Sequence, residues 1–247
     1  MDNNFTADWY NCKNANYKDD LEFYSNILDK QFPVLELGSG TGRLSLHLIS
    51  NQFECYGIEI NKFYKDFLEQ RLIEIKYNKS FHTNFDEIKT EKSRNYQIIL
   101  PFNFLFYIPP NELKYFFEDL TFLKPKAVIF DTDNIISELT VNNLQTRKFT
   151  INDEISGFEK VILSRNEIVV EEYLVTNDKT DLLNNFKLYI HKADFIFNSF
   201  AEQFKVHSLY GNFNKERYNQ YSKKMIGVIK KEMKDHIQNL NSHQRFW

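Results

Sequence analysis

The sequence predicts one α/β domain built on a mostly parallel β-sheet, with a β-rich insert at about residues 150–192. Two observations predict this fold. Up to Asp131, short apolar segments alternate with segments whose apolar residues have helical spacing, which is the pattern of βαβ units. After Asp131, β-prone segments follow one another with no clear helix between them, and they partly alternate apolar with polar residues, as half-exposed antiparallel strands do. We therefore treat residues 1–247 as a single domain that contains the insert.

The first third of the chain contains the clearest βαβ pattern. Residues 34–37 (VLEL) form an apolar run that ends at Gly38 and predicts a buried strand. Helical spacing resumes at residues 41–50, a second strand is predicted at 53–60, and a helix follows through 63–72. A glycine-rich turn therefore lies between the first strand and the helix after it.

The remaining elements follow from the same periodicities. Helices are predicted at residues 18–30, 111–123 and 193–203, and strands at 96–100, 127–130, 158–165, 166–175, 185–191, 204–210 and 225–230. The polar tail from Lys234 to Trp247 is expected to fray.

Charge and cysteine content limit the classes of function. The chain has 31 Lys and Arg against 34 Asp and Glu, a net charge of -3, which disfavours a protein that binds nucleic acid through phosphate charge. Its two cysteines, Cys12 and Cys55, cannot build a disulfide framework or a four-cysteine zinc site. No signal peptide and no apolar stretch of about 18 residues is visible. We expect a cytoplasmic protein that does not enter a membrane and is a monomer or a homodimer.

Three of the seven glycines, Gly38, Gly40 and Gly42, lie close together in the predicted turn. Such a turn brings backbone N–H groups and a helix N-terminus to one point, which suits a nucleotide-like cofactor. The dinucleotide spacing would need a third glycine where Arg43 stands, and Glu36 places a carboxylate beside the turn. A carboxylate repels a pyrophosphate but pairs with an amino group. The turn therefore favours an aminoacyl-nucleoside.

Two further positions extend the candidate cofactor site. Glu59, at the tip of the second strand, is placed to accept two hydrogen bonds from a ribose diol, and the alternative is that it caps the next helix. Asn84 and Phe85 follow an expected third strand. There an amide can bind an adenine edge and a phenyl ring can cover its face, with a solvated turn as the alternative.

Residues 34–72 resemble motif I and the following acidic loop of the class I S-adenosylmethionine-dependent methyltransferases. The resemblance continues through Ile98–Ile108, Leu123-Lys124-Pro125 and Ala127–Asp131 into the C-terminal strand pair, and so covers most of the chain. It implies a Rossmann-like three-layer sandwich whose seven-stranded sheet has the order 3-2-1-4-5-7-6. It also implies S-adenosylmethionine as the cofactor and S-adenosylhomocysteine as its product.

The resemblance also implies a set of cofactor-binding residues: Glu36, Gly38 and Gly40 at the methionine end, Glu59 at the ribose, Asn84 and Phe85 at the adenine, and Leu100 at the end of the strand at 96–100. Two departures from the family pattern stand out. The family has Asp where this chain has Asn84, and it has Gly-Gly after Leu-Lys-Pro where this chain has Lys126-Ala127.

Several acceptor classes fit the sequence poorly. Amino-methylating DNA enzymes carry Asn/Asp-Pro-Pro-aromatic after the fourth strand, where this chain has Leu100-Pro101-Phe102-Asn103. Neither Cys12 nor Cys55 lies where cytosine-C5 enzymes have their nucleophile. Metal-dependent catechol-type enzymes need an acid after strand four and Asp-Asn after strand five. The pair Asp133-Asn134 is present but the first acid is not, so we expect no metal.

What remains resembles small-molecule methyltransferases with antiparallel strands between the fifth strand and the last helix, a group that includes the amino-sugar N-methyltransferases. This resemblance implies that the insert roofs the acceptor pocket and that Tyr10 and Tyr17 belong to an aromatic segment over the cofactor. A sugar hydroxyl needs a base and a neutral amine does not. The candidates for a base are His191, then Asp133 and His207. For His191 the alternative is a surface position on its strand.

The lead hypothesis is a metal-independent methyltransferase that acts on an O or N of a small polar metabolite, such as a sugar or nucleotide-sugar. Three alternatives stay open. They are a methyltransferase with a protein or RNA acceptor, a cofactor-binding module without turnover, and a nicotinamide oxidoreductase, which Arg43 disfavours.

Overall fold

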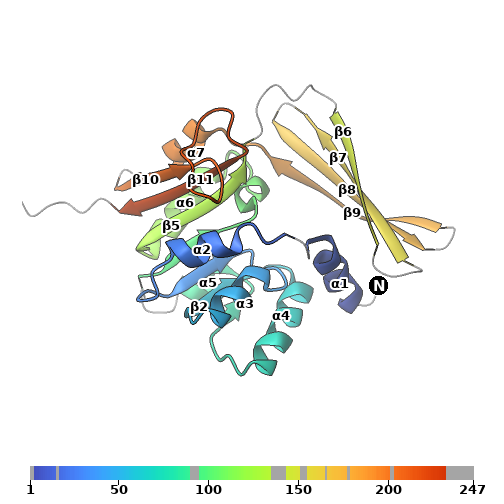
Figure 1. Ribbon diagram of the computed structural model, residues 1–247, viewed down its shortest axis with the longest axis horizontal. Coiled ribbons are helices and arrows are strands. Elements are labelled where there is room, and N and C mark those ends of the chain that lie inside the picture. Colours follow the sequence, from blue (N-terminus) through green and yellow to red (C-terminus); the bar gives the residue numbers. More distant parts are fainter. Residues whose placement is uncertain are drawn as a thin grey trace, which may run out of the picture.

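In a computed structural model, the described part of the chain forms two β-sheets, one of seven strands and one of four (Figure 1). The structure describes residues 3–14, 17–89, 95–134, 143–150, 155–164, 166–176, 179–200 and 203–231. The tail from Lys234 to Trp247, which was expected to fray, lies outside the described residues. Among the described residues, no helix is long and apolar enough to cross a membrane.

The elements have the following bounds. The seven-stranded sheet contains β1 (Val34–Leu37), β2 (Cys55–Ile58), β3 (Phe81–His82), β4 (Gln97–Leu100), β5 (Ala127–Asp133), β10 (Phe204–Tyr210) and β11 (Lys224–Lys231). The four-stranded sheet contains β6 (Asn143–Thr150), β7 (Ile155–Leu163), β8 (Glu167–Thr176) and β9 (Lys179–Tyr189). The helices are α1 (Asn3–Asn14), α2 (Leu21–Ile27), α3 (Arg43–Ser50), α4 (Lys62–Glu74), α5 (Phe85–Lys89), the 3-10 helix η1 (Phe104–Tyr107), α6 (Leu113–Phe122) and α7 (Ala193–Ser199).

The strand order of the large sheet is β3-β2-β1-β4-β5-β11-β10. Numbered within this sheet, it is 3-2-1-4-5-7-6, so the predicted topology is confirmed. The five neighbouring strands β3, β2, β1, β4 and β5 are parallel to one another, and β11 runs antiparallel to both β5 and β10. The carboxyl ends of β1, β2, β4 and β5 therefore meet at one edge, which is where open α/β sheets bind their ligands.

Helices cover both faces of the large sheet, so its central strands are buried on both sides. On one face, Leu44 and Leu48 of α3 and Phe23 of α2 pack against alternate strand residues such as Val34. On the other face, Phe117 of α6 packs in the cluster that holds the intervening strand residues. This two-sided burial explains why the strands read as continuous apolar runs and not as alternating ones.

The four-stranded sheet stands apart from the large sheet and is fully antiparallel (Figure 1). It runs from Asn143 to Tyr189, so it begins before the expected boundary at residue 150 and has four strands where three were expected. Its inner face packs Leu163, Ile168 and Val170 against Phe106 of η1. The insert is thereby attached to the segment that follows β4, at the carboxyl edge of the large sheet.

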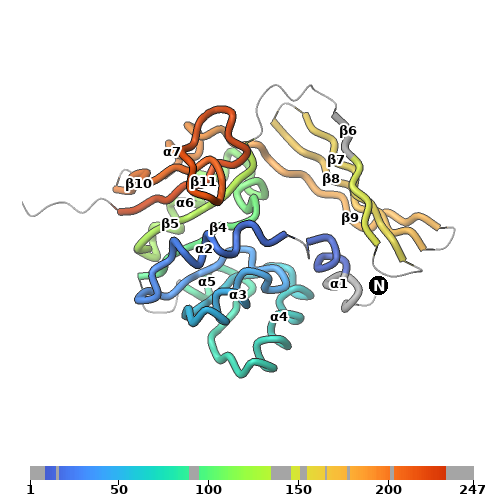
Figure 2. Tube along the Cα trace, in the orientation of Figure 1, coloured from blue at the N-terminus to red at the C-terminus, as the bar shows by residue number. Residues whose placement is uncertain are grey.

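Helix α1 was not predicted, because residues 3–14 (NNFTADWYNCKN) lack an apolar stripe at helical spacing. The helix lies between the lower end of the insert and α4, and Figure 2 traces the chain from it into the large sheet. Trp9 is 1% exposed and its ring meets Phe149 of β6 edge-on, with centroids 4.5 Å apart. Contacts with the insert and with α4, rather than its own periodicity, therefore hold α1 in place.

Candidate functional site

The glycine loop joins β1 to α3. Gly38, Gly40 and Gly42 have φ values of 74°, 56° and 90°, all in the left-handed region that glycine adopts without steric cost. The N–H of Gly38 donates to the main-chain carbonyl of Ile58 over 2.8 Å, which fixes the loop against the end of β2. A Cβ added at Gly38 would lie 2.7 Å from the ring of Phe104, so the loop also touches the segment after β4.

Glu36 lies in β1 and is 3% exposed. Its Oε2 accepts a hydrogen bond from the hydroxyl of Ser45 in α3. Burial raises the pKa of Glu36 to about 8, against the opposing effects of that hydroxyl and of Arg43. A buried carboxyl of this kind takes up charge when a cation arrives beside it. Its predicted contact with the amino end of a cofactor stays a prediction.

Glu59 follows β2 and reaches back to the glycine loop. Its Oε2 accepts the N–H of Gly40 over 2.7 Å, and its Oε1 accepts the N–H of Asn61 over 2.7 Å. Burial raises the pKa of Glu59, and these two hydrogen bonds oppose the rise. The helix cap at α4 belongs to Asn61, whose side chain accepts from the N–H of Phe63. A carboxylate has about four lone-pair positions, so Glu59 retains acceptor capacity for a diol.

Ile60 is a candidate site residue that the sequence interpretation did not include. Its side chain is 82% exposed although it directly follows the buried Glu59. An apolar side chain left open beside a carboxylate that can hold a ribose is available to cover a flat apolar base. The sequence contains a signal for this residue, because Ile60 directly follows the acid in the segment GIEIN. Its apolar side chain instead predicts the last residue of the strand at 53–60.

Asn84 and Phe85 lie where β3 ends, as expected. Asn84 is exposed, and its Oδ1 accepts the N–H of Glu87 over 3.0 Å, so this amide caps α5. Phe85 is half-buried against the core of that face. Leu100 at the end of β4 is fully buried, so its side chain belongs to the core and its main chain is what a ligand can meet. Cofactor contacts at these three residues stay predictions.

The loop after β4 and the end of β5 form a polar cluster, which we call the β4–β5 cluster and define as Phe102, Asn103, Asp131, Asp133 and Lys224. Asp131 accepts the N–H of Phe102 over 2.9 Å. The side chain of Asn103 donates to Asp133 over 2.9 Å and accepts its N–H over 2.6 Å. The ammonium of Lys224 on β11 lies 2.8 Å from Asp133 and 3.4 Å from Asp131. The sequence predicted only Asp133 of this group.

Protonation in the β4–β5 cluster follows from burial and pairing. Burial raises the pKa of Asp131, which is 0% exposed, and the nearby ammonium of Lys224 opposes the rise. Burial alone would lower the pKa of Lys224, but the two carboxylates outweigh it and raise that pKa above its ordinary value. Lys224 is therefore charged at neutral pH. Asp133, with its side chain 48% exposed, is the open member of the cluster.

His191 is 6% exposed, so the alternative of a surface position does not hold. Its Nε2 lies 2.9 Å from the carbonyl of Ile108 and 3.1 Å from that of Leu105, at the end of η1. Its ring stacks on Phe195 with centroids 5.9 Å apart. Burial lowers the pKa of the imidazole, and the two carbonyls oppose the change. These contacts give His191 a packing role at η1, and its role as a base stays a prediction.

Helix α1 covers the glycine loop. A Cβ added at Gly40 would lie 3.3 Å from the hydroxyl of Tyr10. The hydroxyl of Thr41 donates to the side-chain oxygen of Asn11 over 2.5 Å. The ring of Tyr10 also packs on Tyr64 of α4, with centroids 4.9 Å apart. The aromatic segment that the resemblance implied thus meets the loop at Tyr10.

Tyr17 brings a second aromatic residue to the β4–β5 cluster. Its ring packs on Phe102 with centroids 4.9 Å apart, and the ammonium of Lys224 lies 5.9 Å from its centre. Its hydroxyl is buried without a hydrogen-bond partner among the described residues. Because an unpaired buried hydroxyl is costly, this atom is suited to meet a polar group of a bound ligand.

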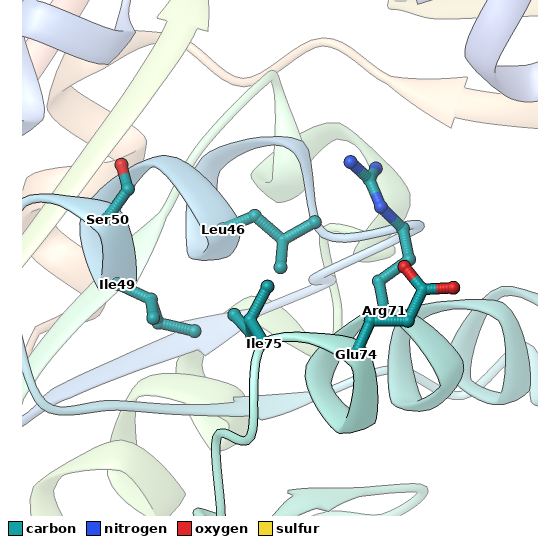
Figure 3. A pocket seen from close by; sticks show the side chains of 6 residues that line it. All are labelled: Leu46, Ile49, Ser50, Arg71, Glu74 and Ile75. Atoms are coloured by element: carbon teal, nitrogen blue, oxygen red, sulfur yellow. The ribbon is translucent and has the colours of Figure 1, made fainter.

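A recess of about 320 Å³ lies elsewhere, between α3 and the end of α4 (Figure 3). Leu46, Ile49 and Ile75 supply its apolar lining, and Ser50, Arg71 and Glu74 complete it. None of the expected cofactor or catalytic residues lines this recess. It is therefore separate from the candidate site at the carboxyl edge of the sheet.

The sheet order, the left-handed glycine loop after β1 and the acid after β2 define the class of fold: the chain has the fold of the class I S-adenosylmethionine-dependent methyltransferases. No protein-family model matches the sequence. No curated protein matches it either.

Solved structures supply the particular likenesses. A S-adenosylmethionine-dependent methyltransferase from Clostridium acetobutylicum matches with a TM-score of 0.73 at 13% identity, covering 94% of this chain and 99% of that one. The CcbJ methyltransferase from Streptomyces caelestis matches with a TM-score of 0.70 at 17% identity, covering 89% and 92%. The sugar N-methyltransferase KedS8 from a Streptoalloteichus species matches with a TM-score of 0.66 at 12% identity, covering 91% and 92%. Because each match spans nearly the whole chain, the insert belongs to the shared fold.

Proposed function

We propose that the chain is an S-adenosylmethionine-dependent methyltransferase that acts on an O or N of a small polar metabolite, a sugar or nucleotide-sugar. The observation that carries the proposal is the hydrogen bond between Glu59 and the glycine loop, in which the carboxylate accepts the N–H of Gly40 over 2.7 Å. This contact brings a carboxylate that can accept hydrogen bonds from a ribose diol next to a left-handed main-chain turn. KedS8, which has the same fold, is a sugar N-methyltransferase, and that supports the acceptor class.

The residues present fit the cofactor at four points. Glu59 has acceptor capacity for the ribose hydroxyls, and Ile60 offers an open apolar side chain for the base. Glu36 is a buried carboxyl whose raised pKa would fall beside the amino group of the methionine end. The buried hydroxyl of Tyr17 is a polar atom in need of a partner. When bound, S-adenosylmethionine supplies a methyl group on a sulfonium, which is a strong electrophile.

The chain's own residues have three tasks in the transfer. The glycine loop and the segment after β4 fix the direction of approach, because an in-line displacement depends on near-attack geometry. Helix α1 and the insert keep water away from the reacting atoms. At the acceptor, Asp133 is the open carboxylate and Lys224 the adjacent cation, so together they can orient a polyhydroxylated molecule.

A proton has to leave the acceptor when the methylated atom is a hydroxyl oxygen. Asp133, half-exposed at the end of β5, is our first candidate to receive it, and His191 is the second. A neutral amine attacks with its free lone pair and needs no base before transfer. The two acceptor types are therefore distinguished by their dependence on Asp133.

Calorimetric titration with S-adenosylhomocysteine tests the proposal, with NADH as the control ligand. We expect binding of S-adenosylhomocysteine alone, with thermal stabilisation of several degrees at about 100 times the dissociation constant. The second step supplies S-adenosylmethionine with amino sugars and nucleotide-sugars and follows formation of S-adenosylhomocysteine. Binding of NADH alone would overturn the proposal. Binding without turnover on any sugar, but with turnover on a peptide or RNA, would overturn the acceptor class.

A further inference from the structure

Two consecutive residues after β4 have a strained main chain. Phe102 and Asn103 have φ values of 56° and 62°, in the left-handed region. Asn tolerates this region because its short side chain bonds locally, whereas a bulky residue such as Phe seldom enters it. Two such residues in succession persist only where the surrounding structure holds them, and strain of this kind is concentrated at functional sites.

Asp131 supplies the main-chain restraints on both residues. Its Oδ1 accepts the N–H of Phe102 over 2.9 Å, and its own carbonyl accepts the N–H of Asn103 over 3.2 Å. A side-chain acceptor and a main-chain acceptor of one residue thus hold two successive left-handed residues. Asp133, two residues further along β5, completes the restraint through the side chain of Asn103.

Asp131 is itself fixed and closed to solvent. Its side chain is 0% exposed, its Oδ1 also accepts the hydroxyl of Tyr24 over 2.9 Å, and its Oδ2 lies 3.4 Å from Lys224. A carboxylate enclosed in this way does not meet a ligand directly. Any effect of Asp131 on the site therefore passes through the residues that it holds.

The strained segment leads directly to the glycine loop. The ring of Phe104, the next residue after Asn103, lies against Gly38. A Cβ added at Gly38 would lie only 2.7 Å from this ring. The N–H of Phe104 donates to the carbonyl of Pro101 over 3.1 Å, which closes the turn. The position of the Phe104 ring against Gly38 thus depends on the conformation of Phe102 and Asn103.

We propose that Asp131 is a positioning residue: by holding Phe102 and Asn103 in the left-handed conformation, it sets the wall of the cofactor site that Phe104 forms against the glycine loop. The inference rests on the proposed function, because it assigns this wall to the site of S-adenosylmethionine. It concerns geometry rather than charge. An uncharged acceptor of the same shape should therefore serve as well as the carboxylate.

The test compares Asp131→Ala, Asp131→Asn and a control, Gln97→Ala, by titration with S-adenosylhomocysteine and by thermal unfolding. Gln97 begins β4 at the opposite end from the strained loop, is 4% exposed and accepts the N–H of Asp29 over 2.8 Å. Its removal therefore costs stability without touching the loop. We expect Asp131→Ala to weaken binding about tenfold or more, because it leaves the N–H of Phe102 unpaired. Asp131→Asn should bind within about threefold of the parent, because the amide oxygen still accepts that N–H. Its NH2 group would face the ammonium of Lys224, so this variant should lower the unfolding temperature without the loss of affinity.

The control separates positioning from general destabilisation. Gln97→Ala should lower the unfolding temperature while its affinity for S-adenosylhomocysteine stays at the parent value. Equal affinities in the parent and Asp131→Ala, or an equal loss in Asp131→Asn and Asp131→Ala, would overturn the inference while leaving the proposed function intact. A parent that does not bind S-adenosylhomocysteine would overturn both. Should Asp131→Ala fail to fold, it is combined with Phe102→Gly, because glycine removes the strain at position 102. If the loop conformation is what sets the wall, this double variant should fold. It should then bind S-adenosylhomocysteine more tightly than the double variant of Phe102→Gly and Asp131→Leu.

Discussion

The ammonium of Lys13 lies 2.6 Å from the carboxylate of Glu159, and this ion pair joins the N-terminal helix to the insert sheet. The same ammonium lies 2.5 Å from Glu172, the register partner of Glu159 on β8. All three side chains are nearly buried, at 15%, 10% and 7% exposure. The helix that this cluster anchors also places Tyr10 over Gly40, so one short helix connects the insert to the glycine loop.

Replacement of Lys13 by Met should release α1 from the insert. Two nearly buried carboxylates would face each other without a cation, and breaking a buried pair in this way costs about 3–5 kcal/mol. We expect faster amide exchange in α1 and weaker binding of S-adenosylhomocysteine, measured by hydrogen-exchange mass spectrometry and calorimetry. Lys148→Met, at an exposed position of β6, is the matched control and should change neither. Unchanged exchange in the Lys13 variant would show that the ion pairs do not hold the helix.

The buried carboxyl of Glu36 predicts a pH dependence of stability. Its pKa is raised to about 8 on folding, so the folded protein binds this proton more tightly than the unfolded chain does. The stability from this group is complete below the ordinary pKa of Glu, about 4.3, and is lost as the pH rises toward 8. We expect Glu36→Gln, which stays neutral, to lose less unfolding free energy than the parent between pH 6 and pH 9. Urea unfolding at the two pH values measures this, and Glu22→Gln on the exposed side of α2 should behave like the parent.

Glu59 should determine affinity for the ribose. Glu59→Gln keeps one oxygen acceptor but loses the charge, and hydrogen bonds to charged groups contribute about 1.5–3 kcal/mol. We expect binding of S-adenosylhomocysteine to weaken about 10- to 100-fold, measured by calorimetry. Glu54→Gln, an exposed acid just before β2, is the control and should bind like the parent. Equal affinities in the parent and the Glu59 variant would remove the ribose assignment.

Ile60 should contribute to affinity without contributing to stability. Its side chain is 82% exposed, so Ile60→Ala removes no buried contact of the folded chain. The side chain of Ile60 would become buried when it covers an adenine. Its truncation in Ile60→Ala should therefore weaken binding of S-adenosylhomocysteine about tenfold. Ile73→Ala on α4, where the side chain is 74% exposed, is the control for an exposed isoleucine away from the site. The same small effect in both variants would contradict a role for Ile60.

His191 separates a packing role from a catalytic one. We expect His191→Asn to lower the unfolding temperature, because the imidazole that bonds the carbonyls of η1 is buried. Once an acceptor substrate has been identified, kcat of this variant should fall less than about tenfold, whereas loss of a general base lowers kcat about 100- to 10,000-fold. His207, the remaining candidate base, is exposed on β10 beside Lys230, which pairs with Ala127 at the amino end of β5. It lies away from the carboxyl edge of the sheet, so His207→Asn is the control. A large loss of kcat at unchanged unfolding temperature would restore His191 as the base.

The sequence alone determined the strands of the main sheet and the glycine loop. Apolar runs such as residues 34–37 predicted strands because the central strands are covered by helices on both faces, and burial on both faces leaves a continuous apolar signal. The glycine cluster predicted the turn because left-handed φ values require glycine at Gly38, Gly40 and Gly42. Both signals are local, so they can be read from neighbouring residues.

Only the tertiary structure determined that α1 forms, that the β4–β5 cluster comes together and that His191 is buried. Helix α1 has no apolar stripe of its own, and its place depends on Trp9 and Lys13 meeting strands more than 130 residues away. Asp131 and Lys224 come together only because β11 pairs with β5. His191 is buried because η1 packs over the end of the insert, which no pattern around position 191 records. Each of these contacts joins distant segments, and pairings of that kind leave no periodicity in the chain.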